Sequence, residues 1–244
     1  MEQKDWFASW FDTSYYHLLY QHRSEDEAKA FIERLVDFLR LQPQTSVLDL
    51  ACGKGRHART LHALGLQVLG TDLSSQSIHF AQNSASEGLR FQVHDMRETL
   101  PNERFGAVFN LFTSFGYFDD TSDNQRVIND AIAEMLLPNG ILVIDFLNAQ
   151  RVRDTLVASE VAQRGTITFE IQREISHGKV VKHIAFTDQG QRLQYQEQVQ
   201  LLELADFKKL LQEQFQILHT FGDYALNAFE PSSSPRLILI ASRK

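Results

Sequence analysis

The sequence predicts an α/β fold: a doubly wound, mostly parallel sheet of seven strands with an inserted antiparallel β-meander. Short apolar segments alternate with helical segments between residues 46 and 146, as in a parallel sheet that is covered on both faces. The hydrophobic period then changes to strict alternation over residues 168–202. Two further apolar segments follow, joined by a loop with no helical pattern, so they should run antiparallel to each other.

Length and composition indicate one globular unit. The chain has 244 residues, of which 43% are hydrophobic and 23% charged, and these are ordinary values for a folded domain. We therefore treat residues 1–244 as a single domain. Residues 1–41 form an aromatic-rich and then helical N-terminal segment, and residues 163–203 form the antiparallel insertion.

The first long helix has a clear beginning and end. Ser24 is followed three residues later by Glu27, which is the spacing of a capping box. Apolar residues recur at helical spacing behind this pair, and Pro43 ends the element.

The remaining elements follow from the same two periods. The expected strands of the main sheet cover residues 46–51, 67–71, 89–94, 105–112, 141–146, 215–221 and 237–242. The expected helices between them cover residues 56–64, 75–86, 123–137 and 206–214. Three antiparallel strands, over residues 168–175, 180–187 and 193–202, form the meander and leave one face in solvent.

Charge and cysteine content exclude several classes of protein. The formal net charge is −7, which disfavours binding to a nucleic-acid backbone. The single cysteine excludes a disulfide framework, and the histidines show no paired metal-ligand spacing, so we expect no metal. No apolar run approaches the roughly 18 residues that a membrane span needs, and the N-terminal residues do not read as a signal peptide. We expect a cytoplasmic enzyme.

The sharpest motif joins the first expected strand to the next helix. Gly53 and Gly55 let the backbone turn tightly and let a ligand lie against it, and the helix that follows points its N–H groups at that ligand. Asp72 ends the second expected strand, where an acid can accept hydrogen bonds from a ribose. Asp95 ends the third, on the same edge of the sheet.

These residues fit two classes of ligand. Gly53, Gly55 and Ala58 also satisfy the dinucleotide-binding fingerprint, so a nicotinamide oxidoreductase is one alternative. Asp49 opens the motif where that class has a small apolar entry, and Asp95 suits an adenosine base better than a pyrophosphate. Both acids favour the other class, an adenosyl ligand without a second nucleotide.

The same residues closely resemble the class I S-adenosylmethionine-dependent methyltransferases of the small-molecule type. The resemblance covers about residues 30–150 and returns, in element order only, from residue 206 to the end. It implies a Rossmann-like methyltransferase fold, S-adenosylmethionine as cofactor and S-adenosylhomocysteine as product. The motifs that carry it are Asp49-x-Ala51-Cys52-Gly53-x-Gly55, the segment 68–74, His94-Asp95-Met96 and residues 109–112.

The resemblance assigns a role to the residues of the first loop. Gly53 and Gly55 would lie beneath the methionine part of the cofactor. Asp49 would steer the methionine ammonium or the loop itself. Ala51 departs from the glycine that most often begins this loop, and we count it among the cofactor-binding residues.

The following strand ends receive the adenosine part by the same resemblance. Asp72 would hold the ribose hydroxyls, with Leu73 against the adenine. Asp95 would accept hydrogen bonds from the adenine amino group, and Met96 would pack on the ring. Asn110, at the end of the fourth strand, would face the methyl donor.

The segment 11–23 is similar to the lid helix of the small-molecule members, in which a tyrosine and an arginine close over the methionine end. Tyr16 and Arg23 are the candidates here, because a guanidinium suits a carboxylate. The candidate catalytic residues are Tyr16, His57 and Tyr117, and His22 is a further candidate base. The candidate substrate-binding residues are Tyr117, Tyr224 and Phe229.

The function expected from the sequence is methyl transfer to a nitrogen or oxygen atom of a small molecule by in-line displacement. The alternatives are aminopropyl or another transfer on the same fold, a non-catalytic adenosine-binding subunit, and the NAD-dependent oxidoreductase named above. No nucleic acid or membrane partner is expected. For the inserted meander we expect one of two roles: it covers the substrate, or its edge pairs two copies of the chain as a homodimer.

Overall fold

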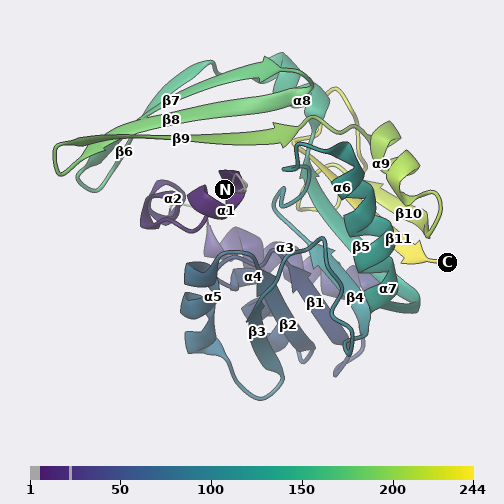
Figure 1. The fold of residues 1–244 in the computed structure, drawn as a ribbon. Helices are drawn as coiled ribbons and strands as arrows, with labels where there is room; N and C mark the ends of the chain where they lie inside the picture. Colours follow the sequence, from purple (N-terminus) through teal and green to yellow (C-terminus); the bar gives the residue numbers. More distant parts are fainter. Residues whose placement is uncertain (1–5, 22–23) are drawn as a thin grey trace.

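The computed structural model describes residues 6–21 and 24–244, and Arg23 and His22 lie outside these residues. Its main sheet has seven strands in the order β10-β11-β5-β4-β1-β2-β3 (Figure 1). Neighbouring strands from β5 to β3 are parallel, whereas β11 runs antiparallel to both β5 and β10. The predicted doubly wound, mostly parallel sheet is therefore confirmed. The strands are β1 (Ser46–Leu50), β2 (Gln67–Asp72), β3 (Leu89–Val93), β4 (Phe105–Asn110), β5 (Leu136–Leu147), β10 (Phe215–Phe221) and β11 (Arg236–Arg243).

Helices cover both faces of this sheet and bury one apolar cluster on each side. On one face the buried cluster joins the strands to helices α3, α4 and α5, which span Glu25–Leu39, Arg56–Ala63 and Ser75–Ala81. A 3₁₀ turn, η1 (Gln82–Ser84), follows α5. The other face is covered by α6 (Thr121–Gln125), the π-helix η2 (Arg126–Ile132), α7 (Ala133–Met135) and α9 (Leu204–Leu211). Within the described part of the chain, no helix has the length and apolar character that crossing a bilayer requires.

The start of α3 confirms the role predicted for Ser24. Its hydroxyl oxygen accepts a hydrogen bond from the backbone N–H of Glu27 at 3.1 Å, which satisfies one of the free donors of the first turn. The three acidic residues of that turn also favour the positive end of the helix. The helix ends at Arg40, which is left-handed with φ +52°.

The segment predicted as one α-helix over residues 123–137 differs in its middle. Seven of its residues form η2, in which the hydrogen bonds are of the wider i to i+5 type. Val127, Ile128, Ala131 and Ile132 are still buried against the sheet. The apolar pattern predicted the buried face correctly because it does not distinguish one hydrogen-bonding interval from the other.

The insertion is a second sheet of four strands, so the prediction of three was wrong. Strand β6 (Ser159–Arg164) precedes β7 (Ile167–Ser176), β8 (Lys179–Asp188) and β9 (Gln191–Gln200), and all four pair antiparallel in chain order. The insertion therefore begins before residue 163, after a short helix, α8 (Ala149–Thr155), that was also missed. Only Ala162 of β6 is buried, so its sequence carries little of the apolar alternation of a strand.

Two N-terminal helices lie between the inserted sheet and the main domain (Figure 1). Helix α1 (Trp6–Trp10) and helix α2 (Ser14–Leu19) are joined by a short turn in which Thr13 caps α2. Trp10 and Leu19 share a buried cluster with Phe169, Ile184 and other residues of the inserted sheet. The inserted sheet therefore packs on these two helices, and Gln200 of β9 also bonds directly to Phe118 and Asn124 of the main domain.

Candidate functional site

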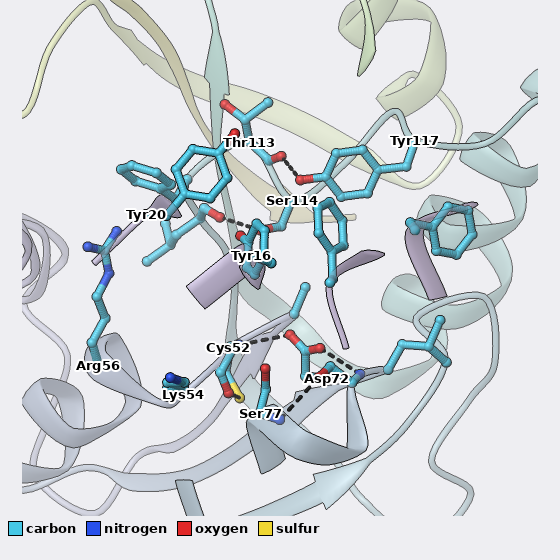
Figure 2. Close-up of a pocket in the computed structure, with 18 of the residues that line it drawn as sticks. Tyr16, Tyr20, Cys52, Lys54, Arg56, Asp72, Ser77, Thr113, Ser114 and Tyr117 are labelled. Carbon is cyan, nitrogen blue, oxygen red and sulfur yellow. Dashed lines mark hydrogen bonds between the residues drawn. The ribbon is translucent and has the colours of Figure 1, made fainter. Parts of the chain in front are cut away.

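A cavity of about 580 Å³ opens at the carboxyl ends of β1, β2, β3 and β4. Its floor is built from the loops that follow these strands, within residues 51–57, 72–80, 94–96 and 111–118. Its roof comes from α1, α2, Tyr20 and the β9 residues Glu197 and Val199. In Figure 2, Asp72 and Ser77 lie toward one end of the cavity and Thr113, Ser114 and Tyr117 toward the other, with Tyr16 between them. Ligand sites in open α/β sheets occupy this edge.

The glycine loop forms the turn that the sequence predicted. Ala51, Gly53 and Gly55 have φ values of +62°, +56° and +78°, so three of five residues are left-handed. Ala51 adopts this conformation despite its Cβ, which explains why glycine is the residue expected there. A Cβ on Gly53 would meet no atom within 4 Å, because Gly53 borders the open cavity. The bare backbone at Gly53 thus leaves room for a ligand to lie against it.

Gly55 serves the packing of the loop and does not line the cavity. A Cβ on Gly55 would lie 2.6 Å from Cε1 of Phe91, and one on Gly70 would lie 2.6 Å from Cδ1 of the same ring. Phe91 therefore fits under the loop only because both neighbours are glycine. Gly55 also begins α4 without a side-chain cap, which leaves the N–H groups of that helix without a capping side chain.

Asp72 joins two of the loops at the floor of the cavity. Its carboxylate accepts hydrogen bonds from the backbone N–H groups of Gly53 and Ser74, each at 2.8 Å (Figure 2). Burial raises the pKa of Asp72 although these hydrogen bonds favour its ionised form. The position predicted for a ribose ligand therefore lies in the cavity, with its carboxylate oriented by the glycine loop.

The residues predicted to hold the adenine also border the cavity. Leu73 is 37% exposed and Met96 packs on the main core, and both line the cavity beside Asp95. The carboxylate of Asp95 already forms an ion pair with Arg97 at 2.7 Å. Burial opposes ionisation of Asp95, but the hydrogen bonds and charge of Arg97 hold its pKa below the ordinary value. Arg97, which was not predicted, also forms an ion pair with Asp123 at 3.3 Å.

Asp49 and Asn110 are buried and do not line the cavity among the described residues. The Nδ2 group of Asn110 donates to the carbonyls of Leu50 and Ser114, so this side chain ties the loop after β4 to β1. Its expected orientation toward a methyl donor stays a prediction. Oδ2 of Asp49 has no hydrogen-bond partner, and burial raises the pKa of Asp49 to about 7. Its action on a ligand would have to be electrostatic, through the loop.

The candidate catalytic side chains all border the cavity. His57 is 7% exposed in the first turn of α4. Tyr16 packs on Phe11 and Tyr20, with ring centroids 4.9 and 5.0 Å apart. The hydroxyl group of Tyr117 donates a hydrogen bond to the backbone carbonyl of Thr113. The structure thus brings these three residues to one cavity.

The two substrate-binding candidates in the last loop pack against the protein itself. Tyr224 packs on Phe31 with ring centroids 4.4 Å apart, and its hydroxyl donates to Asp145 at 3.2 Å. Burial raises the pKa of Tyr224, and the nearby Asp145 raises it further. Phe229 packs against the main core. Neither borders the cavity, because the last loop folds back on the sheet and only Arg236, after it, reaches the cavity wall.

The inserted sheet supplies a polar group to the roof that the sequence analysis missed. The carboxylate of Glu197 accepts a hydrogen bond from Nε1 of Trp10 at 2.7 Å and another from the hydroxyl of Tyr20. Lys182 lies 3.4 Å from the same carboxylate and also donates to Tyr20. The alternation of β9 placed Glu197 on one face with Tyr195 and Val199, which was the available signal, but it did not show what this face covers.

A second missed contact joins the N-terminal helices to the floor. Oδ1 of Asp12 accepts hydrogen bonds from the hydroxyl of Ser74 at 2.7 Å and from the backbone N–H of Gln76 at 2.9 Å. Ser74 is the residue whose N–H binds Asp72. Asp12 therefore links the roof to the loop after β2 through both Ser74 and Gln76. Among the described residues no cluster of histidine, cysteine and acidic side chains could hold a metal ion.

Comparison with known proteins identifies the fold and the motif. The family model of a methyltransferase domain matches residues 47–140. A dTDP-3-amino-3,4,6-trideoxy-alpha-D-glucopyranose N,N-dimethyltransferase of Streptomyces venezuelae is 26% identical over 196 residues, which are 78% of this chain and 81% of the relative.

Solved structures agree over nearly the whole chain. An S-adenosylmethionine-dependent methyltransferase of Clostridium acetobutylicum superposes with a TM-score of 0.79 at 20% identity, covering 93% of this chain and 95% of that one. CalS10, an amino pentose methyltransferase of Micromonospora echinaspora with bound S-adenosylmethionine, gives 0.67 at 17% identity, covering 92% and 93%.

The cavity itself fits S-adenosylmethionine. Gly53 offers bare backbone, Asp72 an oriented carboxylate, and Leu73 and Met96 apolar surface, all on one wall. The domain match covers this wall in full, which excludes the nicotinamide reading of the glycine motif. The motif, the strand order and the comparisons agree: residues 47–140 match a methyltransferase domain, and the whole chain has the fold of the S-adenosylmethionine-dependent methyltransferases.

Proposed function

We propose that the protein transfers a methyl group from S-adenosylmethionine to a nitrogen or oxygen atom of a small molecule. The observation that carries this proposal is the roof of the cavity. Helices α1 and α2 and strand β9 cover the cavity opposite its floor, so the room beside the donor is bounded on several sides. A cavity of about 580 Å³ falls within the roughly 300–1,000 Å³ of small-ligand sites.

The donor would be held by the residues of the floor. Asp72 would bind the ribose, Leu73 and Met96 the adenine, and the backbone at Gly53 the methionine part. Tyr16 would close over the methionine end from above. When bound, S-adenosylmethionine supplies a methyl group on a positively charged sulfur, which is already electrophilic.

The chain contributes orientation and exclusion of water. Holding two reactants in line can supply about 7–11 kcal/mol of the barrier. The aromatic residues of the roof would keep water from competing for the methyl group. A neutral nitrogen needs no strong base, whereas an oxygen acceptor would need one, and Tyr16, His57 and Tyr117 are the candidates that border the cavity.

Nitrogen is the favoured acceptor atom. The relative from Streptomyces venezuelae is named for N,N-dimethylation of an amino sugar, and CalS10 for methylation of an amino pentose. Their similarity covers 78% and 92% of this chain, respectively. A small-molecule amine is therefore the first substrate class to test.

The test is incubation with S-adenosylmethionine that carries a tritiated methyl group, together with panels of small amines, small alcohols and phenols, total RNA and total protein. We expect label in amines and S-adenosylhomocysteine as the second product. Label found only in RNA or protein would refute the proposal. Methylthioadenosine in place of S-adenosylhomocysteine would indicate aminopropyl transfer, and binding without turnover a non-catalytic subunit.

Two further expectations belong to the same proposal. We propose that the enzyme acts in the cytoplasm, in keeping with its single cysteine. We also propose that β6, which forms one edge of the four-stranded sheet, pairs with its copy in a homodimer. Light scattering that shows a monomer at every concentration would refute the pairing.

A further inference from the structure

The loop that follows β4 contains a strained turn. Phe112 and Thr113 both have φ +62°, and they are consecutive. The left-handed conformation brings Cβ too close to the carbonyl oxygen, and the cost is felt most by bulky and β-branched residues such as these two. Such a conformation persists only where the surrounding structure enforces it.

A buried carboxylate enforces it. Asp145, on β5, is 1% exposed. Its Oδ2 accepts the backbone N–H of Phe112 at 2.8 Å, and its own backbone carbonyl accepts the N–H of Thr113 at 2.9 Å. One residue of the neighbouring strand thus holds the backbone of both left-handed residues.

Two side chains from the C-terminal part of the chain complete the arrangement. Nε of Arg236 donates to Oδ1 of Asp145 at 2.8 Å, and its Nη2 donates to Oγ1 of Thr113 at 2.9 Å. The hydroxyl of Tyr224 donates to Oδ2 of Asp145 at 3.2 Å. The charge of Asp145 is therefore compensated by Arg236, and the pair would be costly to break from one side only.

The strained turn lies in the wall of the cavity. Phe112, Thr113 and Ser114 line it. In Figure 2, Thr113 and Ser114 lie at the end away from Asp72. The carbonyl of Thr113 also accepts the hydrogen bond of Tyr117, which lines the same wall. The position of that wall, and of Tyr117, therefore depends on the conformation of Thr113.

We propose that Asp145, Arg236 and Tyr224 form a positioning cluster, which holds Phe112 and Thr113 in the left-handed conformation and so sets the acceptor side of the cavity. The assignment of that side to the acceptor rests on the proposed function. The cluster acts through the turn: Asp145 and Tyr224 do not line the cavity, and Arg236 reaches its wall. It also gives Tyr224 a role other than the direct substrate contact predicted from the sequence.

The test compares Asp145→Asn with the double variant Asp145→Asn/Thr113→Gly. Loss of the carboxylate should lower kcat/KM for an amine acceptor about 10- to 100-fold, as misplaced reacting groups do. The Kd of S-adenosylmethionine should stay within about twofold, as for an independent site. Glycine adopts positive φ without strain, so Thr113→Gly should restore part of the lost activity in the double variant although it removes a contact.

The matched control is Glu170→Gln, which removes the acid of an exposed ion pair with Arg192 on the inserted sheet and should change neither value. An equal loss of donor affinity and activity in Asp145→Asn would overturn the proposal, and so would the absence of rescue by glycine. Should Asp145→Asn fail to fold, Tyr224→Phe removes one hydrogen bond and should give the same pattern to a smaller degree. Unchanged kinetics in that variant would then count against the cluster.

A crystallographic readout separates this inference from the proposed function. In structures of the wild type and Asp145→Asn, φ of residues 112 and 113 should be positive in the first and relax to negative values in the second. This result does not depend on any acceptor. A wild type that binds S-adenosylmethionine and methylates no small molecule would refute the proposed function alone, whereas unchanged φ angles in the variant would refute the positioning cluster alone.

Discussion

We expect an alanine substitution to have different consequences at Gly53 and at Gly55. Alanine at either position must adopt positive φ, which costs about 1–2 kcal/mol of folding stability. At Gly55 the new Cβ would also lie 2.6 Å from Phe91. The ring of Phe91 cannot move away, because it also packs closely on Gly70, where a Cβ would lie 2.6 Å from it. Overpacking of this kind costs about 1–3 kcal/mol more. We therefore expect Gly55→Ala to lose about 2–5 kcal/mol and Gly53→Ala about 1–2 kcal/mol.

The order should reverse for binding of the donor. Gly53 borders the cavity, so its Cβ would occupy ligand space, and we expect Kd to rise about tenfold, or 1.4 kcal/mol. Gly55 lies behind the loop, and its variant should bind nearly normally at a temperature where it is folded. Urea denaturation measures the stabilities and calorimetry the affinities. If the same variant has both the larger loss of stability and the larger rise in Kd, the two glycines do not have these separate roles.

Three further predictions follow from single side chains. Asp72→Ala should weaken S-adenosylmethionine binding by about 1–3 kcal/mol, and an unchanged Kd in calorimetry would contradict the ribose role. Asp49 has a pKa raised from 3.8 to about 7, so its ionised form is disfavoured in the folded state and stability is lost as the pH rises from 4 through 7. Asp49→Asn should remove that loss, making the variant the more stable protein at pH 8 by at most about 4 kcal/mol, with no such gain in urea titrations at pH 4. Glu197→Gln should loosen the roof, so amide exchange in α1 and α2 should accelerate while that in β1 stays constant.

The parallel part of the sheet could be predicted because each of its strands is apolar and ends in a recognisable turn. Strand β6 could not, because it is a polar edge strand with only Ala162 buried. The π-helix could not be predicted for a different reason. Its wider hydrogen-bonding interval leaves the buried face, and therefore the apolar pattern, unchanged. The boundaries of the insertion were missed along with β6.

The floor of the site was predictable because it is local. Gly53, Asp72 and Asp95 each follow a strand, and parallel strands end on one edge. The direction of a side chain depends on tertiary packing, which the sequence does not show. Asn110 and Tyr224 lie at the predicted end of the sheet, but their side chains form hydrogen bonds within the protein rather than lining the cavity. The contacts of the roof were the hardest to predict from the sequence, because the hydrogen bond from Trp10 to Glu197 joins residues 187 positions apart.

That long span has a consequence for how the protein matures on the ribosome. Translation proceeds at about 5–20 residues per second, so roughly 10–40 s separate the appearance of Trp10 from that of Glu197. The aromatic N-terminal helices are made first, and the inserted sheet on which Trp10 packs is made long after them. Throughout that interval Trp10 lacks the surface that buries it in the folded protein, which favours binding of a chaperone to this part of the nascent chain.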